Sequence, residues 1–153
     1  MALQTTINIE QAYGKEGSYA DNSPRRAMTK VLAGNTPTLG RVFTQSTTNE
    51  KEAIMGGTGA IVGIAINDGT AALGCNLTAS LEVRVGATAT IANFAHVLVK
   101  PSNAVDFGDA ACYTNADGIV KGGTAGTGET QLPNSRFISK ASVGQLAILE
   151  LNL

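Results

Sequence analysis

The sequence predicts an all-β protein, a single β-sandwich or barrel-like domain of short strands with an extended N-terminal arm. Two observations lead to this prediction. Residues 81–99 form an almost continuous strand-like run of apolar and polar side chains. Elsewhere, short apolar runs are separated by frequent turns, and 18 of the 153 residues are glycine. Many short strands joined by such turns are typical of sandwiches and barrels.

The chain length suits one domain, which we divide into an arm, residues 1–34, and a β-rich domain, residues 35–153. The arm is rich in glycine and small polar residues and supplies little core, so we expect it to become ordered by packing on something else. Two interpretations fit its last part. Ser23–Ala33 could form one or two helical turns, with Ser23 as the N-cap, or Ala27–Leu32 could form a strand.

Alternation and turn residues place the strands of the domain. Within residues 81–85, Leu81, Val83 and Val85 are expected on one face, and the alternation resumes at residue 88 after a glycine. The other expected strands cover residues 40–44, 54–55, 59–66, 88–93, 95–99, 110–114, 119–120, 136–139 and 145–152. Residues 59–66 are apolar at nearly every position, which predicts a strand covered on both faces, and Gly63 predicts a bulge or a close backbone approach.

Composition excludes several function classes. Asp, Glu, Lys and Arg make up only 15% of the residues, against about 25% in typical globular proteins. This neutral surface repels neighbouring copies weakly, which favours self-association or lattice contacts. The net charge of −1 gives no support for nucleic-acid binding. No apolar run is long enough for a membrane helix, and no signal peptide is apparent, so we expect synthesis in the cytoplasm.

The residues that could carry chemistry are few. His96 lies in a strand-like run and is interpreted as a structural side chain, with metal ligation beside Cys75 or Cys112 as a weaker alternative. Both cysteines are expected to be buried free thiols, a disulfide being the alternative. Asp106 and Asp109 fit hydrogen bonding to backbone amides in a turn. We therefore predict no catalytic residue, no metal site and no cofactor.

The arm contains the candidate contact residues. Arg25 and Arg26 are the only adjacent basic pair, and Tyr13 and Tyr19 are the aromatic residues before them. A solvated or locally paired turn is the simpler interpretation of the basic pair, and docking to an acidic partner is the alternative. We take Tyr13, Tyr19, Arg25 and Arg26 as candidate contacts to a partner or to another subunit.

Several short sequence motifs occur in an order that resembles a known family. They are Gly-Arg-Val-Phe at 40–43, Val-Gly-Ile-Ala-Ile at 62–66, Leu-Glu-Val-Arg-Val-Gly-Ala at 81–87, Val-Asp-Phe-Gly-Asp-Ala-Ala-Cys-Tyr at 105–113, Asp-Gly at 117–118, Arg-Phe at 136–137 and Gly-Gln-Leu-Ala-Ile-Leu-Glu-Leu at 144–151. Over roughly residues 24–153 this order resembles the capsid cement, or decoration, proteins of tailed bacteriophages.

The resemblance implies a non-enzymatic structural virion protein. Such a protein binds the outer surface of an icosahedral capsid and stabilises the lattice by bridging capsomers. Its implied partners are the major capsid protein and itself, as a homotrimer, with an arm that reaches neighbouring subunits. The alternative is another virion surface module, of tail, fibre or head surface, that binds a host or a glycan. An enzyme with an unrecognised site is a third hypothesis.

Overall fold

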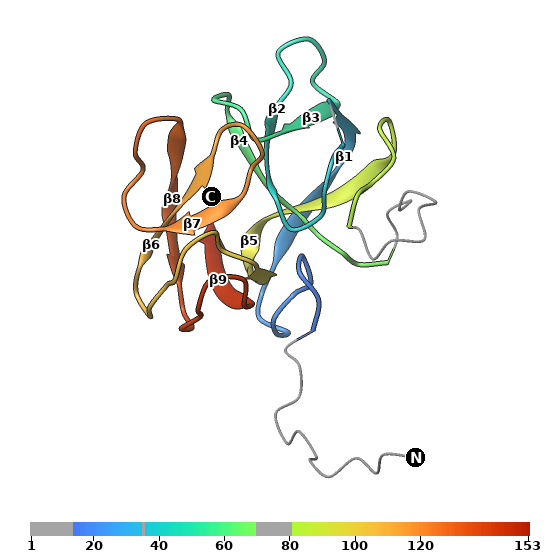
Figure 1. Ribbon diagram of the computed structural model, residues 1–153. Helices are drawn as coiled ribbons and strands as arrows, with labels where there is room; N and C mark the ends of the chain where they lie inside the picture. Colours follow the sequence, from blue (N-terminus) through green and yellow to red (C-terminus); the bar gives the residue numbers. More distant parts are fainter. Residues whose placement is uncertain (1–13, 35, 70–80) are drawn as a thin grey trace, which may run out of the picture.

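The computed structural model describes residues 14–34, 36–69 and 81–153, and in these it contains nine strands and no helix (Figure 1). The strands are β1 (Arg26–Ala33), β2 (Val42–Gln45), β3 (Glu52–Met55), β4 (Ile61–Ala65), β5 (Thr88–Val99), β6 (Ala110–Thr114), β7 (Val120–Gly122), β8 (Glu129–Phe137) and β9 (Ala147–Asn152). The predicted all-β class is confirmed.

Five of the strands close into a barrel. Its order is β1-β3-β2-β4-β5, and pairing of β5 with β1 completes the circle. All of these pairs are antiparallel except β1 with β3, which is parallel. The barrel abolishes most of the free edges that an open sheet of this size would have.

The strand β5 links the barrel to a second group of strands. Its first half pairs with β1 and β4, whereas Phe94–Val99 pairs with β9, from which the sheet continues as β8, β6 and β7. In Figure 1, β6 to β9 accordingly stand beside the barrel, with β5 running between the two parts. A single 12-residue strand therefore belongs to both halves of the molecule.

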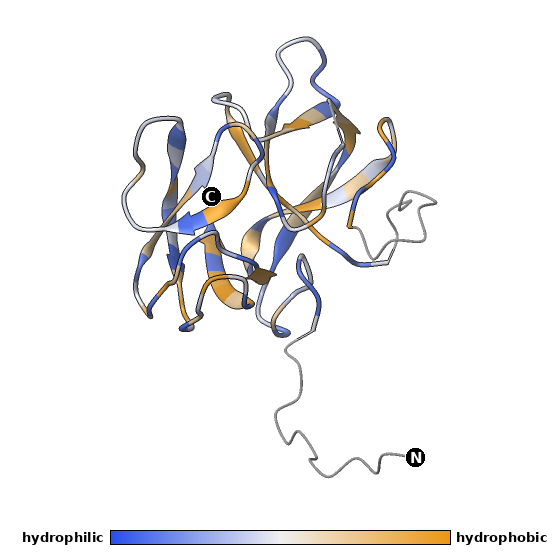
Figure 2. Ribbon diagram, viewed as in Figure 1, coloured by the Kyte–Doolittle hydropathy of each residue, from blue (hydrophilic) through white to orange (hydrophobic). Residues whose placement is uncertain are grey.

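Two hydrophobic clusters fill the structure because neighbouring residues of one strand face opposite sides. Val42 belongs to the larger cluster and Phe43 to the smaller one, and both are fully buried. The larger cluster lies among β4, β5, β6, β8 and β9, and its biggest side chains are Tyr113 and Phe137. The smaller cluster fills the barrel. Figure 2 shows the resulting mixture of apolar and polar positions along the strands.

The turn between β6 and β7 attaches the second group of strands to the barrel. Val42 donates its N–H to the carbonyl of Gly118 over 2.9 Å, and Gly57 donates to that of Asn115 over 2.7 Å. The hydroxyl of Tyr113 donates to the carbonyl of Gly57 over 3.0 Å, so this large aromatic residue has no unsatisfied polar atom. These bonds hold the two parts in a fixed orientation.

Gly63 is required where β2, β4 and β5 meet. The register between β2 and β4 shifts at Phe43, which pairs with Gly63, so the predicted bulge is confirmed. The φ angle of Gly63 is +147°, and a Cβ atom there would lie 2.0 Å from the carbonyl oxygen of Ala92 on β5. The predicted close backbone approach is therefore also present, and only glycine fits.

The structure decides between the two interpretations of residues 23–33. The helical interpretation is wrong and the strand interpretation is confirmed, because β1 pairs with β5 over six positions and with β3 at Val31–Ala33. Leu32 is fully buried as a result. The division of the chain at residue 34 remains a prediction, but the last eight residues before Gly34 form β1, one of the five strands of the barrel.

Two other expectations need correction. Residues 81–85 make only an isolated bridge between Glu82 and Thr38, and Val85 is 54% exposed although Val83 is buried. The chain bends away there into a turn at Gly86, whose φ is +84°. β8 starts at Glu129, seven residues before the expected strand. The prediction missed this part because it is polar and contains Pro133, which is compatible with a strand that bulges against β6.

Residues 14–24 lie along the second half of β5. Gly17 donates its N–H to the carbonyl of Leu98 over 2.7 Å, Leu98 donates back to Ser18 over 2.9 Å, and Ala20 donates to His96 over 2.8 Å. Beyond these backbone bonds, His96 Nδ1 lies 2.6 Å from the carboxylate of Asp21. His96 thus has the partner expected of a structural histidine, and it fastens this segment to β5.

We predict that Gly63→Ala destabilises the fold by about 3 kcal/mol, since a methyl group would collide with a backbone carbonyl that cannot move alone. In a domain of this size the loss corresponds to a fall in Tm of roughly 6–12 °C. Gly144→Ala is the matched control: its φ is +81°, but no atom lies within 4 Å of the added methyl group, so only backbone strain of about 1 kcal/mol is expected. Equal Tm values for the two variants would contradict the close-approach argument.

We also predict a pH-dependent attachment of residues 14–24. Hydrogen bonds from His96 and then Ser23 lower the pKa of Asp21 from its usual range to about 2. An unfolded aspartate titrates near about 3.9, so the ionised carboxylate stabilises the folded chain above that pH, and this contribution is lost as the pH falls through about 2. Asp21→Asn should therefore speed amide exchange of Ala20 severalfold at pH 7, and the difference should vanish near pH 2. An exchange rate unchanged at pH 7 would show that backbone bonds alone hold the segment.

Candidate contact surface

Three of the four predicted contact residues lie in the described chain, and Tyr13 lies outside the described residues. The guanidinium carbon of Arg25 sits 4.4 Å from the centre of the Tyr19 ring, a cation–π contact. Burial raises the pKa of the Tyr19 hydroxyl, against a smaller opposing effect of Arg25. Tyr19 also forms a bridge with Val97 and packs on the larger hydrophobic cluster, so its ring supports Arg25 from below.

Arg26 begins β1 and makes different contacts. Its Nε donates to the side-chain carbonyl of Asn93 over 2.9 Å, and its terminal nitrogen donates to the backbone oxygen of Leu153 over 2.9 Å. Both contacts are exposed. The structure therefore brings Tyr19, Arg25 and Arg26 to one region, where residues 19–26 run beside β5 and the end of β9.

A small groove lies beside this basic pair. It has a volume of about 220 Å³, and its lining consists of Ser23, Pro24, Phe94, Ala95, His96, Glu150 and Leu151. Phe94 is 39% exposed, an unusual state for an aromatic residue in the middle of a strand. This groove could not be predicted from the sequence, because it is formed by residues from three distant segments.

Two further exposed apolar residues occur at loop tips. Phe107 is 73% exposed and Val143 is 64% exposed. Their loops are joined by a pair of backbone hydrogen bonds between Val105 and Ala141, of 2.9 and 3.0 Å, so the two tips are held close together. The sequence analysis did not single out either residue. The signal that could have indicated an exposed position was the aromatic Phe107 directly before the turn residues Gly108 and Asp109.

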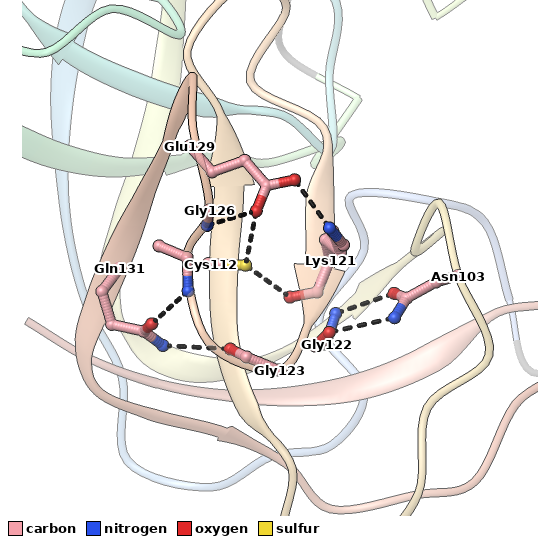
Figure 3. A network of polar contacts seen from close by, with 9 residues as sticks. Asn103, Cys112, Lys121, Gly122, Gly123, Gly126, Glu129 and Gln131 are labelled. Carbon is pink, nitrogen blue, oxygen red and sulfur yellow. Dashed lines mark hydrogen bonds and ion pairs between the residues drawn. The ribbon is translucent and has the colours of Figure 1, made fainter.

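A polar network surrounds the described cysteine (Figure 3). Lys121 donates to Glu129 over 2.7 Å, and Cys112 has its sulfur 3.6 Å from the carbonyl of Lys121. The hydrogen bond from Lys121 lowers the pKa of Glu129, and burial raises that of the Cys112 thiol. Gln131 accepts from the backbone of Ala125 at 2.9 Å. The network fixes the glycine-rich loop 122–128.

These observations test part of the predicted chemistry. Cys112 is a buried free thiol as expected, whereas Cys75 lies outside the described residues. Asp109 accepts the N–H of Asp106 over 2.8 Å, which is the turn bonding that was predicted. Among the described residues no three His, Cys, Asp or Glu side chains gather to form a metal site. Within the same residues, no helix has the length and apolar character needed to cross a membrane.

Comparison with solved structures finds chains that share the fold. A chain in the solved capsid of Myoviridae phage XM1 superposes with a TM-score of 0.74 at 17% identity, over 99% of this chain and 98% of that one. The N base of the head fiber gp8.5 of bacteriophage phi29 is more distant, with a TM-score of 0.48 at 17% identity, over 84% of this chain and 95% of that one. No curated protein matches the sequence.

The sequence itself carries the assignment. The family model described as "Structural cement protein (E217 gp24/Pam3 gp6)" matches residues 3–152, which is almost the whole chain. The resemblance seen in the short phrases of the sequence is thereby confirmed. This chain belongs to the family of phage structural cement proteins and is a structural component of the virion that binds the capsid.

Proposed function

We propose that the protein binds the outer surface of an icosahedral phage capsid and stabilises the lattice by bridging neighbouring capsomers. The family match over residues 3–152 carries this proposal. The major capsid protein is its partner, and the protein acts without catalysis, as a homotrimer made in the host cytoplasm. The low content of charged side chains, 15%, supports close approach to the shell and between copies.

The stabilisation follows from linkage. A protein that binds only the intact lattice lowers the free energy of that lattice relative to the dissociated shell. Several modest contacts made at once give firm attachment, because each contact raises the effective concentration for the next. A bridging protein must also be stiff, and the shared strand β5 together with the bonds at Gly118 supplies a stiff body.

We assign the capsid or subunit contacts to the region of Tyr19, Arg25 and Arg26, with Tyr13 as a further contact. The exposed guanidinium of Arg25 and the partly exposed Phe94 in the adjoining groove support this assignment. A cation next to an apolar groove suits a partner with a carboxylate beside an apolar side chain.

One observation favours a second candidate function. An exposed aromatic at a loop tip is what a receptor-binding module would show, and Phe107 is such a residue. In that case the protein would be a virion surface module that binds a host or a glycan through the tips at Phe107 and Val143.

We predict that particles without this protein release their genome sooner. Otherwise identical particles with and without it would be heated or diluted, and genome release followed by dye fluorescence. The protein should shift the release curve to higher temperature, in proportion to its occupancy. Identical curves at full occupancy would contradict the cement role and would favour the second candidate, which Phe107→Ala then tests in adsorption assays.

We predict that Arg25→Glu weakens attachment to particles about fivefold, the effect of one exposed charge contact, and makes attachment less sensitive to salt. Arg84→Glu is the control, because Arg84 is also exposed but lies away from Arg25. It is close to the turn at Gly86, which donates its N–H to Leu32 at the other end of β1. Cosedimentation with particles at matched folded fraction gives both affinities. A loss of equal size in both variants would assign the effect to overall charge instead of to this region.

A further inference from the structure

We propose that the free edge of β1 at Ala27 and Thr29 is the docking site for an extended, acidic segment of the capsid shell, which adds to the barrel as a further strand. This inference rests on the proposed function and names the partner chemistry of that binding. Strand addition joins backbone to backbone, so it supplies affinity without a deep pocket.

The edge exists because β1 is longer than its neighbour. β1 pairs with β5 along Arg26–Val31, but with β3 only along Val31–Ala33. The first five residues of β1 therefore have a partner strand on one side only. Residues 26–29 are all exposed, and in Figure 1 β1 extends below β3.

The register identifies which backbone groups face outward. Leu32 donates its N–H to Ala87 on the β5 side, and Val31 donates to Lys51 on the β3 side. Backbone groups of a strand alternate between its two edges, so Met28 and Lys30 bond to β5, whereas Ala27 and Thr29 point away from it. Consistent with this, Thr90, which pairs with Thr29, accepts from Ile66 on the opposite side of β5. In the described chain no hydrogen bond involves the outward groups of Ala27 and Thr29.

Positive charge surrounds this edge. Arg25 precedes β1, Lys30 belongs to it, and the carbonyl of Lys51 accepts the N–H of Val31 on the β3 side. The side chain of Arg25 contacts an aromatic ring, and that of Lys30 donates to an amide oxygen and a backbone carbonyl. The ion pairs among the described residues involve instead Arg41, His96, Lys121, Arg136 and Lys140. The edge cations are thus available to carboxylates of a partner.

An open groove borders the same edge. It has a volume of about 680 Å³, and its lining is Thr29, Lys30, Val31, Gln45, Glu50, Lys51 and Thr88. Glu50 is the one carboxylate in this lining and two lysines oppose it, so the groove keeps an excess of positive charge.

Charge also decides between the other occupants. The same edge of a second copy would bring like cations together, which is the usual protection of edge strands against self-pairing. The chain's own residues 1–13 carry a single carboxylate, Glu10. An acidic segment of the shell is therefore the occupant that matches the edge.

The test uses Thr29→Pro in the full-length protein. Proline removes the outward N–H of residue 29, which has no partner within the described chain, and it is tolerated on an exposed edge, so the fold should survive. Thr29→Val is the control, because it keeps the N–H and the branched side chain. Binding to particles prepared without this protein should fall about tenfold for Thr29→Pro, from the loss of one or two backbone hydrogen bonds, and should stay unchanged for Thr29→Val.

Amide hydrogen exchange supplies the second readout. In the free protein the amides of Met28 and Lys30 should be protected and those of Ala27 and Thr29 should exchange fast; on particles all four should be protected. Unprotected Ala27 and Thr29 on particles, with equal binding by Thr29→Pro, would overturn the inference and leave the cement role standing. Protection already present in the free protein would assign the edge to residues 1–13 or a second copy and equally overturn it. Failure of the unaltered protein to bind particles would refute the proposed function as well.

Discussion

β5 is hydrogen-bonded on both sides along most of its length, and the rest of the structure depends on this. Its first half closes the barrel between β1 and β4, and its second half carries β9 on one side and residues 17–20 on the other. Because β5 contributes residues to both hydrophobic clusters, breaking its hydrogen bonds would expose both clusters at once. The two halves of the molecule therefore have to fold and move together.

A stiff body is what the capsid role requires. A bridge between capsomers transmits load only if its two contact regions keep a fixed separation. A hinge between the barrel and the second group of strands would let that separation change. The turn at Asn115–Gly118 closes that hinge by bonding to β2 and to Gly57. The glycine-rich loop 122–128 is likewise fixed, by Glu129 and Gln131. Glycine in this chain thus permits close approach of backbones more than it permits motion.

The sequence predicted strands well where apolar periodicity is strong, and poorly where a segment becomes a strand only by pairing with strands distant in the sequence. Alternation was enough for β5, and the glycine within an apolar run was enough for the bulge at Gly63. β8 was largely missed, since its polar side chains and proline are acceptable only because β6 and β9 flank it. Residues 23–33 stayed ambiguous for a related reason: whether Ala27–Leu32 forms a strand is decided by β5, which is more than fifty residues away.

For the contact surface, the sequence predicted which residues are candidates but not how they are arranged. Arg25 and Arg26 stand out in the sequence as a pair, but their separate environments, a tyrosine face and the end of β9, arise from the fold. The free edge of β1 is invisible in sequence, because it results from a difference in length between two neighbouring strands. An exposed edge in a protein with few charges is a risk for aggregation, and the chain places several of its eleven basic side chains there. The same charges that prevent pairing between copies are suited to select an acidic partner, so solubility before assembly and specificity during assembly have one physical cause.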